Sequence, residues 1–129
     1  MTDNEQVKKA AELAEIIKIA LEDKKGIDPT LLEVGKQTIL ADFFVVCTGT
    51  SNTHVKALAD EVEFKTNEAL GIKPNHIEGF SDNTWTLMDY GSVIVHIFTR
   101  EGREFYKLEK LWKDASAEKV KEIENSKDE

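Results

Sequence analysis

The 129-residue sequence contains a single cysteine, Cys47, and only two prolines. A lone cysteine excludes an internal disulfide and favours a reducing compartment. No apolar run approaches the about 20 residues that a membrane-spanning helix requires. The first residues, Met-Thr-Asp-Asn-Glu, have neither the hydrophobic segment of a secretion signal nor the arginines of a transit peptide. Together these absences predict a cytoplasmic protein that does not insert into a membrane.

Positive charge is also scarce, with 17 Lys and Arg against 25 Asp and Glu and a net charge of −8. Proteins that bind DNA or RNA directly neutralise phosphates with Lys and Arg side chains. The composition therefore argues against direct nucleic-acid recognition. An acidic domain is instead attracted to basic proteins, including basic proteins that themselves lie on nucleic acid.

The apolar periodicity predicts one α/β domain over residues 1–115. Helices are expected at 5–24, 52–70 and 104–115, and strands near 31–34, 43–47, 76–78, 85–89 and 93–98. This α-β-β-α-β-β-β-α order predicts a mixed sheet of about five strands covered by helices. Residues 116–129 are charged and nearly free of large apolar side chains, so we expect a disordered tail.

The predicted hairpin at 85–98 is the most informative segment. Its second strand, from Val93 to Phe98, is apolar at nearly every position, which is typical of a strand buried on both faces. Its first strand mixes aromatic, aliphatic and acidic residues. Strand alternation places Trp85, Leu87 and Asp89 on one face and Tyr90 on the other, unless the turn brings the phenol back. This composition fits an exposed protein-binding edge and a helix–sheet core equally well.

Residues 48–51, Thr-Gly-Thr-Ser, join a buried strand to a helix and could hold an anion or cap the helix. A phosphate loop has more glycines and a lysine, so a cap formed by Ser51 or Asn52 is the favoured interpretation.

His54, His76, His96 and Cys47 show no metal-ligand spacing, so we expect no metal site and no cofactor. Cys47 is interpreted as a small buried hydrophobe. His96 lies in the buried strand and needs a hydrogen-bond partner.

A basic stripe at Lys107, Lys110 and Lys113 follows the third predicted helix. A solvated helix face is the favoured interpretation, and contact between this stripe and a partner is left open.

Five segments, in this order, resemble the ribosomal silencing factor (Iojap) family. They are residues 42–51 (DFFVVCTGTS), 55–62 (VKALADEV), 77–79 (IEG), 85–96 (WTLMDYGSVIVH) and 103–112 (REFYKLEKLW). The resemblance covers about residues 5–115, and its segments are specific in combination.

The resemblance implies a translational repressor without catalytic activity. Members of the family bind the large ribosomal subunit through its fourteenth protein and block joining of the small subunit, which slows translation under nutrient limitation. They are also expected to form homodimers when free. The family contacts its partner through the tryptophan and the residue after the aspartate of a Trp-x-x-x-Asp-x-Gly motif. These two contact residues are Trp85 and Tyr90 here, and we expect Leu87, Asp89 and Gly91 of the same segment to belong to the partner-binding site.

The sequence raises two other classes of function, an enzyme and a non-ribosomal binding module. The family fold is similar to that of nucleotidyltransferases, which hold Mg²⁺ with alternating carboxylates on one strand. Here Asp89 stands alone and Leu87 occupies the place of the second carboxylate, so we expect no enzyme. A binding module for a non-ribosomal protein is the alternative.

Overall fold

The computed structural model describes residues 2–35, 41–80 and 84–102. It contains α1 (Thr2–Asp23), β1 (Ile27–Glu33), β2 (Phe43–Gly49), α2 (Asn52–Leu70), β3 (His76–Phe80), β4 (Trp85–Asp89) and β5 (Val93–Thr99). This order confirms the predicted α-β-β-α-β-β-β succession. The predicted helix at 104–115, its lysine stripe and the tail at 116–129 lie outside the described residues.

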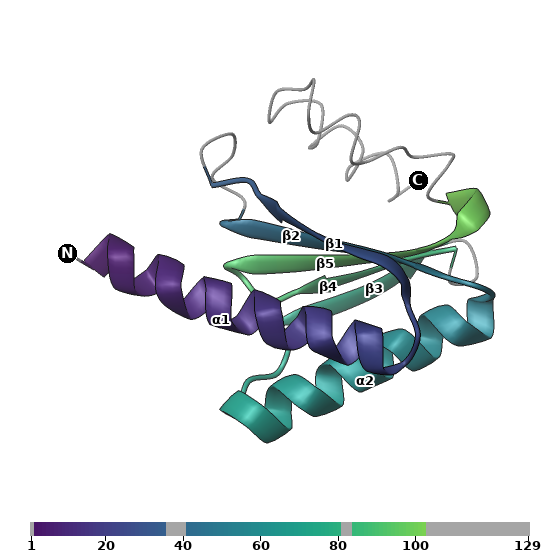
Figure 1. Cartoon of the computed structure of the whole chain (residues 1–129), viewed down its shortest axis with the longest axis horizontal. Coiled ribbons are helices and arrows are strands. Elements are labelled where there is room, and N and C mark those ends of the chain that lie inside the picture. The colour runs from purple at the N-terminus through teal and green to yellow at the C-terminus, as the bar shows by residue number, and fades with distance from the viewer. Residues whose placement is uncertain (1, 36–40, 81–83, 103–129) are drawn as a thin grey trace.

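The five strands form one mixed sheet in the order β1-β2-β5-β4-β3 (Figure 1). β2 and β5 run parallel in the centre, and the other three pairings are antiparallel. All seven residues of β2 and the first six of β5 are buried, which confirms the prediction of strands covered on both faces. β4 is also an interior strand, since it pairs with both β5 and β3. Of the two interpretations that its composition leaves open, an exposed edge does not fit, because β1 and β3 are the edges of the sheet.

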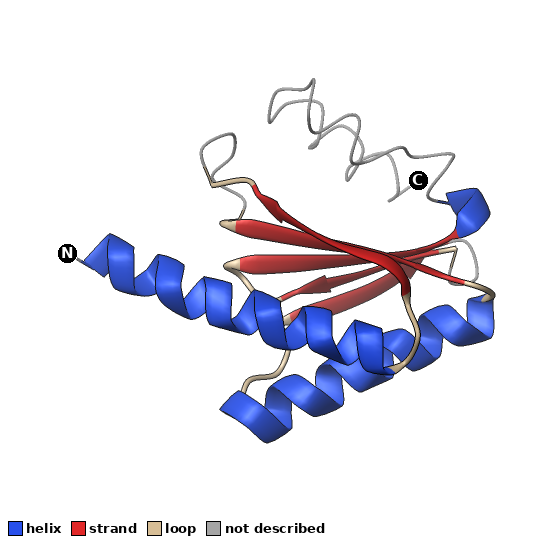
Figure 2. Ribbon diagram, viewed as in Figure 1, coloured by secondary structure: helices blue, strands red, loops and turns tan. Residues whose placement is uncertain are grey.

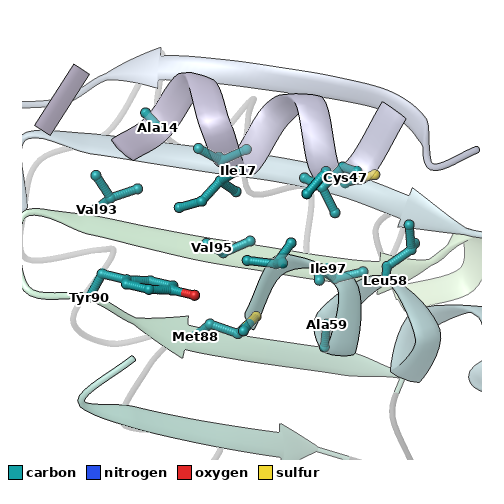
Figure 3. Packing of buried hydrophobic residues seen from close by; sticks show 14 of the residues in the cluster. Ala14, Ile17, Cys47, Leu58, Ala59, Met88, Tyr90, Val93, Val95 and Ile97 are labelled. Atoms are coloured by element: carbon teal, nitrogen blue, oxygen red, sulfur yellow. The ribbon is translucent and has the colours of Figure 1, made fainter. Parts of the chain in front are cut away.

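α1 and α2 lie on the same face of the sheet (Figure 2). Their apolar stripes pack on alternate residues of the central strands, so the larger core lies between helices and sheet (Figure 3). The labelled members of this helix-side core are Ala14, Ile17, Cys47, Leu58, Ala59, Met88, Tyr90, Val93, Val95 and Ile97. Cys47 is fully buried here, as expected of a small hydrophobe.

The intervening strand residues form a second cluster on the opposite face of the sheet. Its members are Val34, Ala41, Phe44, Val46, Trp85, Leu87, Ile94 and Phe98. Neither α1 nor α2 covers this face, because both pack on the other side. The period of two in the strands therefore separates the apolar residues into two cores.

Local hydrogen bonds set both ends of α2. The Ser51 hydroxyl accepts from the His54 backbone N–H at 3.1 Å, which confirms the predicted helix cap. At the other end Gly71 adopts a left-handed conformation with φ of 66°, where the sequence predicted the stop. The His54 ring also accepts from the Thr50 N–H through Nδ1 and bonds the Lys24 carbonyl through Nε2, each at 2.8 Å. Nδ1 is thus the acceptor and Nε2 the donor, and the ring ties the start of α2 to the end of α1.

We predict that Gly26→Ala destabilises the protein, because an added Cβ would lie 2.4 Å from the Cys47 sulfur and 3.0 Å from the Leu21 carbonyl. Overpacking of this kind typically costs about 1–3 kcal/mol of unfolding free energy, measurable by urea denaturation. Removing the sulfur in Gly26→Ala/Cys47→Ala should recover part of the loss. Full additivity of the two single changes would contradict the proposed clash.

Candidate partner-binding site

The five predicted partner-binding residues lie along β4 and the turn that joins it to β5. Their exposures differ sharply: Trp85 is 0 % exposed, Leu87 9 % and Tyr90 7 %, whereas Asp89 is partly exposed and Gly91 exposed. Trp85 therefore does not present its ring at an open edge in this structure. Its contact with a partner stays a prediction.

Trp85 and Tyr90 lie on opposite faces of the sheet. Trp85 packs with Leu87 in the cluster away from the helices, and Tyr90 belongs to the helix-side core (Figure 3). The alternation predicted for this strand is confirmed. The turn does not bring the phenol back beside the indole, so the two aromatics cannot form one contiguous contact patch.

His96 is the hydrogen-bond partner of Trp85. The indole N–H donates to Nδ1 of His96 over 3.1 Å, with both side chains buried. Indole nitrogen is only a donor, so Nδ1 must be the acceptor and the neutral imidazole carries its proton on Nε2. Phe44 and Phe98 complete an aromatic group, with ring centroids 4.7 Å from His96 and 4.8 Å from Trp85, respectively. The partner expected for the buried histidine is thus a neighbour on the adjacent strand.

Tyr90 is bonded to α2. Its hydroxyl lies 2.9 Å from the hydroxyl of Thr66, which itself donates to the Glu63 carbonyl at 3.2 Å. Because Thr66 has only one hydroxyl proton, Tyr90 is the donor in the first bond. Burial raises the pKa of Tyr90 above its ordinary value of 10, and the charge of Glu63 adds to the rise.

Asp89 shapes the turn between β4 and β5. Its Oδ1 accepts from the Gly91 N–H at 2.7 Å, and Gly91 has φ of 87°, a conformation that favours glycine. The Tyr90 N–H donates to the Val93 carbonyl at 2.9 Å across the same turn. The exposed end of the predicted site is therefore a tight turn that presents the Asp89 carboxylate in a fixed position.

The sequence alone does not identify Thr66 or the Trp85–His96 pair as part of this site. Thr66 carried a signal, because it is a polar residue in the apolar stripe of α2. The pairing of Trp85 with His96 follows from the hairpin register, in which Trp85 faces Phe98, two residues beyond His96.

Leu87 is buried in the apolar cluster with Trp85, so it supplies no ligand where a nucleotidyltransferase has its second carboxylate. Among residues 2–35, 41–80 and 84–102, no group of three or more His, Cys, Asp or Glu side chains is arranged to hold a metal ion. No helix in the described part of the chain is long and apolar enough to span a bilayer.

The protein is thus a small α/β domain in which the turn between β4 and β5 holds one carboxylate, that of Asp89, in place. Comparison with known proteins gives the family. Residues 7–129 match the family model described as ribosomal silencing factor during starvation. A ribosomal silencing factor of Bacillus subtilis is 38 % identical over 103 residues, which cover 80 % of this chain and 86 % of that protein. The chain belongs to the ribosomal silencing factor family.

Comparison with solved structures finds the same fold in a related protein. The crystal structure of a protein from Chromobacterium violaceum superposes with a TM-score of 0.72 at 40 % identity, covering 82 % of this chain and 85 % of that one. A mouse protein named mitochondrial assembly of ribosomal large subunit protein 1 is 32 % identical over 95 residues, which are 71 % of this chain and 41 % of the mouse protein.

We predict that Trp85→Ala destabilises the fold, because loss of a fully buried tryptophan typically costs about 3–5 kcal/mol. Trp85→Phe should cost less, since it keeps an aromatic ring in the core. It should still cost some stability, because it loses the hydrogen-bond donor to His96. Denaturant unfolding of both variants would test this order. Unchanged stability of Trp85→Ala would show that the indole is not part of the core.

We predict that Tyr90→Phe lowers the unfolding free energy by about 1 kcal/mol at neutral pH, the usual net contribution of one hydrogen bond. Because the folded pKa lies above the unfolded value of 10.0, this contribution is complete below pH 10 and is lost as pH rises through the folded pKa. The difference between the wild type and Tyr90→Phe should therefore shrink above pH 10 in urea titrations. A constant difference up to pH 11 would contradict the assignment.

Proposed function

We propose that this protein binds the large ribosomal subunit through its fourteenth protein and sterically blocks joining of the small subunit. The observation that carries the proposal is the match of residues 7–129 to the silencing-factor family. The name of the mouse relative also refers to the large ribosomal subunit. Steric occupation needs affinity and position but no catalytic residue. The protein would act in the cytoplasm, where translation occurs.

The turn between β4 and β5 supplies the contact in this proposal. Asp89 pairs with a Lys or Arg of the basic partner, and Gly91 allows the partner backbone to approach closely. Two hydrogen bonds, Asp89–Gly91 and Tyr90–Thr66, hold the turn before binding. Less ordering free energy is then lost on association. Trp85 and Leu87 contribute indirectly, because their packing in the core holds the strand that leads into the turn.

Charge supports the same choice of partner. The net charge of −8 attracts basic proteins and repels free phosphate backbones. In the absence of ribosomes, a homodimer that covers part of the hairpin surface would compete with subunit binding.

Cosedimentation with purified large and small ribosomal subunits tests the function. We expect the protein to pellet with the large subunit and to reduce the yield of joined ribosomes when small subunits are added. Pelleting only with the small subunit would overturn the proposal. Binding to neither subunit would favour a non-ribosomal adaptor.

Two substitutions separate the charge of Asp89 from its structural role. Asp89→Asn keeps an oxygen for the Gly91 N–H and removes the charge, whereas Asp89→Lys reverses it. We expect the association rate with the large subunit to fall in the order wild type, Asp89→Asn, Asp89→Lys at low salt, and the rates to converge as salt is raised.

Glu22→Gln is the matched control for these rates. Glu22 is exposed near the end of α1, and α1 ends beside the start of α2, at the opposite end of the sheet from the turn. It removes the same unit of charge away from the proposed contact. Equal effects of Glu22→Gln and Asp89→Asn would show that only net charge matters and that the turn is not the contact.

A further inference from the structure

We propose that a slot between α2 and the edge strand β3 receives an arginine side chain of a basic partner protein. The slot has a volume of about 190 Å³ and is lined by α2, β3 and Thr86 of β4. It is separate from the β4–β5 turn. That the partner is ribosomal rests on the proposed function, whereas the arginine specificity rests on the slot itself.

Small residues create the space. Gly79 of β3 pairs directly with Thr86 of β4, and Ala59 of α2 also lines the slot. A glycine, a threonine and an alanine cannot fill the gap where the helix crosses the margin of the sheet. Ile77, 43 % exposed, borders the same opening and gives it an apolar wall.

Thr86 lines the slot and carries a buried hydroxyl. Thr86 is 4 % exposed, and its Oγ1 makes no hydrogen bond within the described part of the chain. Buried polar side chains in native proteins are nearly always hydrogen-bonded, so an isolated one indicates a missing partner. A hydroxyl oxygen with two lone pairs can accept from an N–H donor that enters the slot.

The charges at the opening are those that attract a cation. Asp60 and Glu63 are three residues apart on α2 and line the slot together. Lys56 pairs with Asp60 at 3.6 Å. Glu63 takes part in none of the ion pairs between the described side chains. Among the described side chains, the Glu63 carboxylate is therefore left for an external cation.

Size and donor geometry favour arginine. Pockets for drug-sized ligands or nucleotides are usually about 300–1,000 Å³, so this slot fits a single side chain better. The methylene stem of arginine would lie against Ile77 and Ala59. Its planar guanidinium has five donors and can bond Thr86 Oγ1 and the Glu63 carboxylate together. Because β3 is an edge strand, an extended partner segment can run beside it and bring the side chain in.

Titration of the ¹⁵N-labelled protein with the peptide acetyl-Gly-Arg-Gly-amide, followed by NMR, tests the proposal. We expect saturable shifts of the amides of Glu63, Gly79 and Thr86. The citrulline peptide, which has the same shape without charge, should bind at least about tenfold more weakly, as expected for loss of a charged hydrogen bond. A second control is the same peptide with lysine in place of arginine. Equal binding of the citrulline or the lysine peptide would overturn the assignment. So would the absence of amide shifts, or shifts confined to other residues.

Two variants separate binding from folding. Thr86→Val keeps the side-chain shape and removes an unsatisfied hydroxyl, so its melting temperature should equal or exceed that of the wild type while arginine binding weakens. Glu63→Gln should weaken binding as well, and Glu22→Gln should not. Undiminished binding by both Thr86→Val and Glu63→Gln would refute the proposal.

The cosedimentation experiment keeps the two proposals distinct. A protein that binds the arginine peptide but neither ribosomal subunit would retain the slot and lose the proposed function. A protein that pellets with the large subunit but does not bind the peptide would retain the function and lose the slot.

Discussion

The parallel pairing of β2 with β5 is the constraint on which the rest of this fold depends. Seven consecutive residue pairs join the two strands, from Phe43 with Val93 to Gly49 with Thr99. Parallel neighbours cannot be joined by a tight turn, so the chain between them must cross over the sheet. That connection contains α2, β3 and β4. β1 then pairs with the free side of β2 and β4 with the free side of β5, so the central pair determines every other position.

The same constraint holds the candidate partner-binding turn from both faces. β5 is fixed by β2, and a short turn joins β5 to β4, so the position of β4 is fixed as well. Side chains alternate along β4, and Trp85 and Tyr90 therefore face opposite cores. The Trp85–His96 bond supports the strand from one face and the Tyr90–Thr66 bond from the other. A substitution at either aromatic therefore alters stability as well as any contact made by the turn. Stability must be measured beside binding before a weaker complex is attributed to a lost contact.

Local signals predicted most of the fold, and pairing partners account for what they missed. Ser51 and Gly71 bound α2 because capping and left-handed backbone depend on a few adjacent residues. β1 begins at Ile27, earlier than predicted. Its first residues lack the regular alternation of a strand, because Asp28 has positive φ and the register shifts before Thr30. The sequence leaves Trp85 open between a core and an exposed edge, because the composition of β4 fits both. The pairing of β3 outside β4 is what makes β4 an interior strand.

Because Trp85 is buried, the proposed recognition depends on charges held in fixed positions and not on an exposed aromatic anchor. A net charge of −8 attracts any basic protein, so it supplies association rate rather than selectivity. Selectivity requires acceptors held at defined positions, where a wrong partner would leave a polar group unpaired. Asp89 at a rigid turn and Thr86 with Glu63 in the α2–β3 slot are such acceptors. A basic partner that matched only one of them would be attracted as strongly from a distance and would dissociate faster.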